Sequence, residues 1–252
     1  MCGIVGYIGP REPQPLILEG LRRLEYRGYD SAGIATIDGG ALDVRKAAGK
    51  IAELEAELDR APVTGSVGIG HTRWATHGAP TTRNAHPHSD GSGRVALVHN
   101  GIIENHDILR TKLVELGHEF ESATDTEVLC HLIEQVYDGN LEQAVAVALS
   151  RVEGAYGIAV IHSDDPDKIV IARSLSEGFR TRTGLVGVLE VAVVWERLQE
   201  EVSGLHMLGY AEPSGRRDVG PGYVDYVLEV AGHQVRVALV RQPFWEVYRV
   251  YD

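Results

Sequence analysis

The chain has 252 residues, 44% of them hydrophobic, which is enough to bury the core of one sizeable domain. Its formal net charge of -12 at pH 7 argues against an extended nucleic-acid-binding surface. No run of about 18 apolar residues occurs, so no membrane-spanning helix is expected, and the start lacks the basic segment of a secretory signal. Only two cysteines occur, Cys2 and Cys130; they make no disulfide framework and favour a reducing, cytoplasmic setting.

Hydrophobic periodicity predicts a mixed series of strands and helices. In chain order, the first half is expected to contain a strand at 3–8, a helix at 14–25, a hairpin of strands at 31–38 and 41–45, a helix at 50–60 and a strand at 66–74. A strand at 94–99, helices at 106–116 and 128–136, a helix at 141–152 and strands at 154–162 and 168–172 follow. This order lacks strict βαβ alternation, so it favours an α+β fold of stacked sheets with helices outside them.

Two connecting segments carry signals of their own. Residues 75–93 are rich in Thr, Pro, Gly, Asn and His, which is typical of a long loop that holds a site. Thr124-Asp125-Thr126-Glu127 fits a capping box at the start of the helix that follows.

The chain reads differently from about Ser174 onward. Residues 188–202 are interpreted as a helix with an ambiguous, Val-rich start, and Pro221-Gly222 is interpreted as a turn. Residues 224–230 and 235–239 alternate apolar with more polar side chains and predict a hairpin.

The strongest chemical candidate is Cys2. Removal of Met1 would leave it with a free α-amine of pKa about 7.7–8.0, so one residue would supply both a nucleophile and its base. A thiol needs only modest activation. The bland alternative is an incidental cysteine near a disordered start, but Gly3–Gly6 place this thiol at the head of a strand, where a catalytic group is held rigidly.

An enzyme that hydrolyses the glutamine amide also needs groups for the substrate carboxylate, its ammonium and the oxyanion. Arg73 suits the carboxylate, and Asp125 suits the ammonium. Asn100 offers a side-chain amide and Gly101 a backbone N–H for the oxyanion. Each has an alternative: a surface ion pair for Arg73, a helix-dipole role for Asp125, and a tight hairpin turn for Asn100-Gly101.

Five ordered sequence blocks resemble the glutaminase domain of the glutamine–fructose-6-phosphate aminotransferases, the glucosamine-6-phosphate synthases, over residues 1–173. The blocks are Cys2-Gly3-Ile4-Val5-Gly6-Tyr7-Ile8-Gly9, Leu24-Glu25-Tyr26-Arg27-Gly28-Tyr29-Asp30-Ser31-Ala32-Gly33, His71-Thr72-Arg73-Trp74-Ala75-Thr76-His77-Gly78, His99-Asn100-Gly101-Ile102-Ile103-Glu104-Asn105 and Thr124-Asp125-Thr126-Glu127. The second and third blocks point to the sugar-amine branch of the amidotransferases.

The resemblance implies a four-layer αββα fold of the N-terminal nucleophile class, with L-glutamine as substrate and a glutamyl thioester on Cys2. It implies Asn100 and Gly101 as the oxyanion hole, without a metal or organic cofactor. The residues that it assigns to glutamine binding or to the loop over glutamine are Arg73, Trp74, Thr76, His77 and Asp125. It implies Arg27 as a residue that supports the surroundings of Cys2.

The remaining histidines and the second cysteine have bland interpretations. His86 and His88, with His71, His77 and His99, could suggest metal ligands, but their spacing matches no helical zinc motif, so loop structure or substrate gating is favoured. Cys130 lies on the apolar face of an expected helix and is interpreted as a packed core thiol.

Residues 174–252 match no part of the resembled family and are an unassigned tail: substitute terminal strands, or a fused module. The tail resembles the nuclease core of type I restriction subunits faintly, but it lacks the Glu-x-Lys pair that such a core needs.

The sugar-isomerase domains of the family are expected, if anywhere, in another chain. The alternatives to an active glutaminase are a non-catalytic binding protein on the same fold and a nuclease-like fusion. A homodimer is one option for the assembly.

Overall fold

The structure is a computed structural model that describes residues 2–166, 168–174, 191–195, 215–220, 223–230, 233–242 and 245–250. From residue 173 onward only the backbone and its strand pairing are described. Within these residues, no helix has the length and apolar character needed to cross a bilayer.

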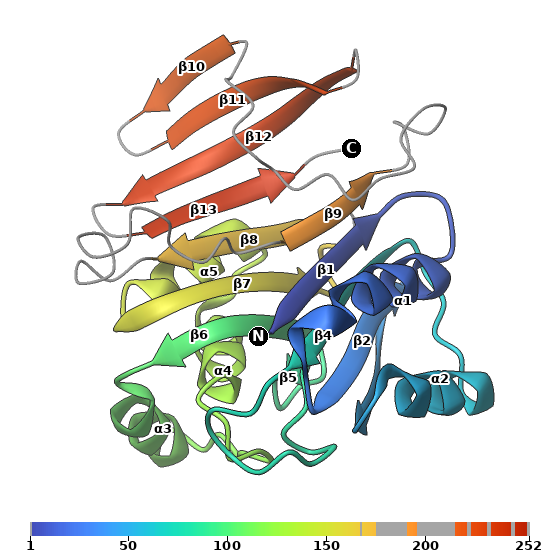
Figure 1. The fold of residues 1–252 in the computed structure, drawn as a ribbon. Helices are drawn as coiled ribbons and strands as arrows, with labels where there is room; N and C mark the ends of the chain where they lie inside the picture. Colours follow the sequence, from blue (N-terminus) through green and yellow to red (C-terminus); the bar gives the residue numbers. More distant parts are fainter. Residues whose placement is uncertain are drawn as a thin grey trace.

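The first strand of the chain belongs to a five-stranded sheet (Figure 1). Its five strands follow the order β3-β2-β4-β1-β9. Their bounds are β1 (Gly3–Ile8), β2 (Ser31–Asp38), β3 (Ala41–Ala48), β4 (Val67–Arg73) and β9 (Val191–Trp195). β1 therefore lies inside the sheet, antiparallel to β4 and parallel to β9.

The second sheet has eight strands in the order β10-β11-β12-β13-β8-β7-β6-β5. The strands that face the first sheet are β6 (Val95–Ile103), β7 (Gly154–His162) and β8 (Ile169–Ser174), and β5 (His88–Ser89) pairs with β6 at the edge. The remaining strands are β10 (Gly215–Gly220), β11 (Tyr223–Val230), β12 (His233–Gln242) and β13 (Trp245–Val250). All described neighbours in this sheet pair antiparallel.

Helices cover the outer faces of the two sheets (Figure 1). The first sheet packs against α1 (Pro13–Leu24), which a 3-10 turn at Glu25–Arg27 follows, and against α2 (Ile51–Arg60). The second packs against α3 (His106–Glu115), α4 (Glu127–Val136) and α5 (Leu141–Leu149). A separate apolar layer, including Ile4, Ile69, Val98 and Ile161, fills the space between the sheets. The result is the predicted four-layer αββα arrangement.

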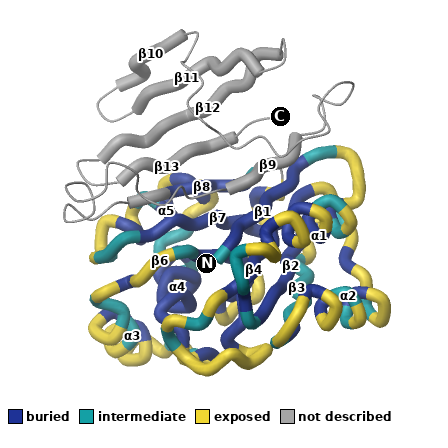
Figure 2. Tube along the Cα trace, in the orientation of Figure 1, coloured by how far each residue is buried: buried dark blue, intermediate teal, exposed yellow. Residues whose placement is uncertain are grey.

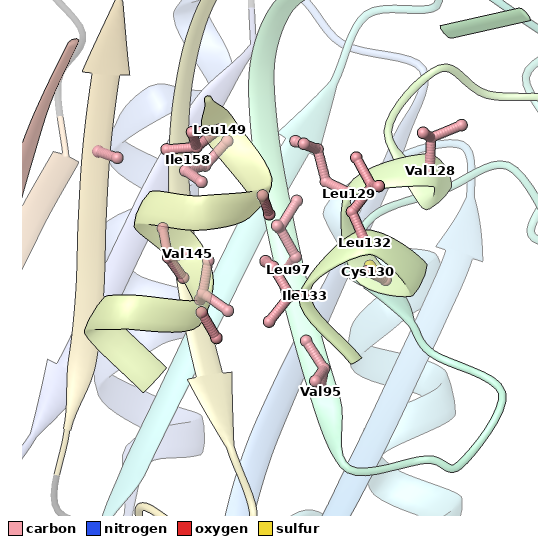
Figure 3. Packing of buried hydrophobic residues seen from close by; sticks show 14 of the residues in the cluster. Val95, Leu97, Val128, Leu129, Cys130, Leu132, Ile133, Val145, Leu149 and Ile158 are labelled. Atoms are coloured by element: carbon pink, nitrogen blue, oxygen red, sulfur yellow. The ribbon is translucent and has the colours of Figure 1, made fainter. Parts of the chain in front are cut away.

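The inner strands β1, β2 and β4 of the first sheet are buried (Figure 2), and the side chains around them pack closely. Gly70 of β4 shows how tightly, because a Cβ there would lie 2.3 Å from Cγ2 of Ile17 on α1. On the other side, α4 inserts Leu129 and Ile133 against Leu97 of β6 (Figure 3). Burial of such side chains contributes about 1.5–3 kcal/mol each before the entropy of ordering is subtracted.

The described elements confirm most of the predicted order up to residue 172, with ends that differ by a few residues. Two expectations were wrong. Residues 191–195 form β9 instead of part of a helix, because β-branched valines suit a strand paired with β1. The strand predicted to end at residue 99 runs on to Ile103. The expected hairpin after residue 223 is present as β11 and β12, which pair antiparallel. Pro221-Gly222 lies outside the described residues.

Candidate active site

Cys2 directly precedes β1, and Arg73 is the last residue of the neighbouring strand β4. The strands pair with Gly3 opposite Thr72, so Cys2 and Arg73 lie side by side at one end of the sheet. The backbone N–H of Trp74 donates to Sγ of Cys2 over 3.2 Å. Burial raises the pKa of the thiol, although the Trp74 N–H and the positive charge of Arg73 oppose it. Cys2 therefore rests as a neutral thiol near pH 7 and needs a base to become a nucleophile.

Asn100, on β6 of the other sheet, reaches the backbone of Cys2. Its Nδ2 donates to the Cys2 carbonyl over 3.4 Å, and its Oδ1 lies 2.8 Å from Nε2 of His71. Burial lowers the pKa of His71 to about 3, so the ring is neutral and its Nε2–H must be the donor to Oδ1. The hydrogen bond from His71 thus fixes which end of the Asn100 amide faces Cys2.

Gly101 continues β6 in a backbone conformation that only glycine adopts easily. Its φ is +132°, and a Cβ there would lie 2.1 Å from the carbonyl oxygen of Ala155. The hairpin-turn alternative for Asn100-Gly101 was wrong, because Asn100 pairs with Gly157 and Gly101 with Tyr156 inside the β6–β7 ladder. The Asn-Gly signal marks a close approach of two strands here instead of a turn.

Arg73 is buried and is bound to the loop that follows it. Its Nη2 donates to the carbonyls of His77 and of Gly78, the latter over 3.4 Å. Its buried Nη1 has no hydrogen-bond partner among the described residues. Burial lowers the pKa of the guanidinium, and the charges of Asp30, Cys2 and Asp125 oppose this shift. The surface ion-pair alternative therefore fails, and one buried N–H face is left for an anion.

Asp125 lies just before α4, and its Oδ2 accepts the backbone N–H of Ile103 over 2.9 Å. It is buried, and this bond anchors it to the end of β6. The expected capping box is wrong: Thr126 precedes α4 without a side-chain cap. The Glu127 carboxylate instead accepts the N–H groups of Glu121 and Ser122, each over 2.7 Å, because that preceding segment folds back onto it.

The loop after β4 carries Trp74, Thr76 and His77, and Arg27 lies in the turn next to it. Trp74 is 55% exposed and Thr76 is also exposed, whereas His77 is half-buried with its ring 5.2 Å from that of His106. A Cβ at Gly28 would lie 3.2 Å from the Trp74 ring, so this ring stands against the turn that carries Arg27. Nε of Arg27 donates to the Tyr26 hydroxyl over 3.1 Å. Its support of Cys2 stays a prediction.

Four of the five histidines that suggested metal ligands, all except His77, form a buried, hydrogen-bonded group near Asn100. The ring of His86 lies 4.4 Å from His71 and 4.7 Å from His88. Thr126 Oγ1 bonds both His86 and His99, over 2.9 and 2.8 Å. Burial lowers the pKa of all four rings. Among the described residues, the His and carboxylate atoms that approach metal-ligand spacing lie elsewhere.

Two contributors were missed at the sequence level. Asp30 accepts the N–H of Ala75 over 2.6 Å and the Ser31 hydroxyl over 3.0 Å, which holds the start of the 74–78 loop. His71 was weighed only as a metal ligand. Its place two residues before Arg73 on a fully buried strand was the available signal, because alternation puts both side chains on the same face.

Comparison with known proteins finds a similarity over part of this chain. A family model described as a glutamine amidotransferase domain matches residues 71–176. Residues 71–176 form a glutamine amidotransferase domain. This stretch contains Arg73, Asn100, Gly101 and Asp125, and the preceding residues contribute Cys2.

The amidotransferase domain has relatives of much greater length. The chain is 57% identical over 176 residues to a glutamine–fructose-6-phosphate aminotransferase [isomerizing] of Symbiobacterium thermophilum, covering 70% of this chain and 29% of the relative. It is 54% identical over 175 residues to the enzyme of the same name from Pyrococcus horikoshii, covering 69% and 29%. The chain thus spans under a third of the length of these curated relatives.

A solved structure supports the fold. The glutamine phosphoribosylpyrophosphate amidotransferase of B. subtilis, solved with ADP and GMP, matches with a TM-score of 0.57 and 32% identity. The match covers 69% of this chain and 36% of that one. The layered α+β fold of the amidotransferase domain, expected from the sequence, is confirmed.

Proposed function

We propose that the chain hydrolyses the side-chain amide of L-glutamine to glutamate and ammonia, with Cys2 as the nucleophile. The observation that carries this proposal is the approach of Asn100 to Cys2 across the two sheets, with Nδ2 at 3.4 Å from the Cys2 carbonyl. An amide donor beside a thiol is what acyl transfer requires. The names of the matched relatives, which are glutamine-dependent aminotransferases, support the same substrate.

The proposed reaction proceeds through a thioester. Once Met1 is removed, the α-amine of Cys2 takes the thiol proton, and Sγ forms a bond to the amide carbon. Asn100 Nδ2 and the Gly101 N–H stabilise the oxyanion that develops on the amide oxygen. The carbon–nitrogen bond then breaks, and ammonia leaves with the proton that the amine held. Water attacks the thioester and releases glutamate, which restores the thiol.

The rest of the site holds the amino-acid end of glutamine. Arg73 has a buried donor, Nη1, without a partner among the described residues, which suits the α-carboxylate. Asp125, whose charge acts on Arg73, suits the α-ammonium. Trp74, Thr76 and His77 belong to the loop that Arg73 holds through its carbonyl contacts, so carboxylate binding and loop position are coupled at one guanidinium.

The test uses the purified full chain. Intact mass establishes whether Met1 has been removed, and glutamate release from glutamine is then measured for the wild type and Cys2→Ala. We expect release by the wild type only, and covalent labelling of Cys2 by 6-diazo-5-oxo-norleucine. Folded protein that has lost Met1 and still releases no glutamate would contradict the proposal and favour a binding protein on the same fold.

We further propose that the ammonia serves amino-sugar synthesis with a sugar-phosphate isomerase domain in another chain. The similarity to the isomerizing aminotransferases supports this, and the aligned region is under a third of their length. Mixing the chain with glutamine and fructose-6-phosphate should yield glutamate but no amino sugar until such a domain is added.

We propose a cytoplasmic location, which the two free cysteines favour. Homodimer formation is a further proposal, tested by light scattering.

We propose that residues 174–252 serve as substitute terminal strands and not as an independent module. The pairing of β13 with β8 and of β9 with β1 supports this, because each adds to a sheet of the first 173 residues. Truncation after Ser174 should then lower the unfolding temperature. An unchanged unfolding temperature would instead favour a separately folded tail.

A further inference from the structure

Three potential metal ligands converge between α3 and α4, away from Cys2. His118 follows α3, and His131 and Glu134 lie one turn apart on α4. Nδ1 of His118 is 3.2 Å from Nδ1 of His131. Oε2 of Glu134 lies 3.4 Å from each of these two nitrogens. Three ligand atoms from two segments therefore form a nearly equilateral triangle.

The size of this triangle matches one face of a zinc tetrahedron. Zn²⁺ binds imidazole nitrogen and carboxylate oxygen at about 2.0–2.2 Å, so neighbouring ligand atoms in a tetrahedral site lie about 3.3–3.6 Å apart. The observed separations of 3.2, 3.4 and 3.4 Å would need almost no rearrangement. The fourth corner would be left for water.

The surroundings of the triangle also suit a metal. His131 is buried, and its second nitrogen, Nε2, faces Glu127 with Oε1 at 3.8 Å. This is a charge contact and not a hydrogen bond, and Nε2 has no hydrogen-bond partner among the described residues. The ring of Phe120 packs 4.5 Å from that of His131 and forms an apolar wall. The side chains of His118 and Glu134 keep 16% and 26% of their exposure, which gives an ion access from solvent.

We propose that His118, His131 and Glu134 bind a divalent transition metal of the Zn²⁺ class through three protein ligands, with one position left open. The ion would tie the segment after α3 to α4. The proposal does not depend on the proposed amide hydrolysis, since the three residues lie outside the residues assigned to glutamine. The sequence signal was the His131-x-x-Glu134 spacing, which puts both side chains on one helix face.

The alternative is a metal-free group in which one imidazole Nδ1–H donates to the other Nδ1, and the Glu134 carboxylate accepts from that same N–H. Such a group predicts no saturable uptake of metal. It also predicts that removing the Glu134 charge changes stability equally with and without metal. The two interpretations therefore separate by direct binding measurements on the full chain.

The test uses the full chain with Cys2→Ser throughout, so that no half-buried thiol competes for the ion. After removal of metal with EDTA, Zn²⁺ uptake is followed by competition with a chromophoric chelator, and Co²⁺ is added as a spectroscopic probe. We expect one equivalent per chain, tetrahedral Co²⁺ absorption bands and a rise in unfolding temperature with Zn²⁺. Glu134→Gln and His118→Asn should each weaken Zn²⁺ binding by at least about tenfold.

Glu115→Gln is the matched control, because it removes the same charge from an exposed position at the end of α3. It should bind Zn²⁺ as tightly as the parent. The proposal is overturned if the parent takes up no stoichiometric metal at micromolar concentration. It is also overturned if Glu134→Gln and His118→Asn bind as tightly as Glu115→Gln does. Circular dichroism on each variant confirms that it is folded.

Discussion

His71→Leu tests the hydrogen bond that orients the Asn100 amide. In the wild type, Nε2–H of the neutral His71 ring lies 2.8 Å from Asn100 Oδ1, which leaves Nδ2 facing Cys2. Leucine fills a similar volume but cannot donate. Holding the productive orientation then leaves a buried carbonyl oxygen unsatisfied, which costs about 1–3 kcal/mol. If the amide turns to avoid that cost, the oxyanion donor is lost.

The loss of the oriented Asn100 amide should lower kcat, because the oxyanion that the amide stabilises forms only after Sγ attacks the bound glutamine. A penalty of about 1–3 kcal/mol corresponds to a fall in kcat of about 5- to 150-fold. KM for glutamine should change little, since Arg73 and Asp125 are untouched. Glutamate release at saturating glutamine, measured on protein shown to be folded, gives the number.

His86→Leu is the control for removing a buried histidine. Its ring is also fully buried and packs 4.4 Å from His71, but its Nε2 bonds Thr126 instead of Asn100. The reasoning is refuted if folded His71→Leu keeps kcat within about twofold of the wild type. It is equally refuted if both variants lose the same activity, because the loss would then reflect general disruption of the core.

Three further predictions concern stability and thiol chemistry. Burial lowers the pKa of His71 from 6.5 to about 3, so only the unfolded chain takes up that proton between these values. The free energy of unfolding should therefore fall as pH drops below 6.5, by about 1.4 kcal/mol per pH unit for this ring. In His71→Leu, the free energy of unfolding measured with urea should change with pH less steeply, by that amount per pH unit. Gly101→Ala should destabilise the chain by more than the roughly 1–3 kcal/mol of backbone strain, because the added Cβ also meets the backbone of Ala155. The control Gly117→Ala, at φ +95° with nothing near its Cβ, should show the strain alone. Thermal unfolding of both variants measures the difference. Because burial raises the pKa of Cys2, its alkylation by iodoacetamide should still be accelerating at pH 9.0, and a plateau well below that pH would contradict this.

The layered fold could be predicted because each element carries its own periodic pattern. The Val and Ile residues of β4 and the apolar face of α4 are local signals that tertiary packing did not override. The misplaced features depend on distant partners. Asn100-Gly101 is a strand because β7 pairs with it, and Glu127 binds residues 121–122 because that segment folds back. Neither partner can be read from the local sequence.

The candidate residues were named from the sequence, but their relations were not. Cys2, Arg73 and Asn100 could be chosen by chemical type, yet the role of His71 depends on a side-chain contact between two sheets. The tail strands were harder still, since their assignment depends on which edge they join. Sequence patterns specify which face of an element is buried. The pairing register between strands that lie far apart in the sequence comes only from the assembled sheets.

The two cysteines differ in burial, so their reactivity reports whether the chain is folded. Cys130 is fully buried in the α4 layer (Figure 3), and burial raises its pKa well above the ordinary value. Cys2 is only half-buried. A native molecule should therefore present one titratable sulfhydryl to a bulky thiol reagent, and an unfolded one should present two. The stoichiometry of labelling in any preparation then counts the fraction of molecules whose core has formed, without a substrate and without a spectroscopic label.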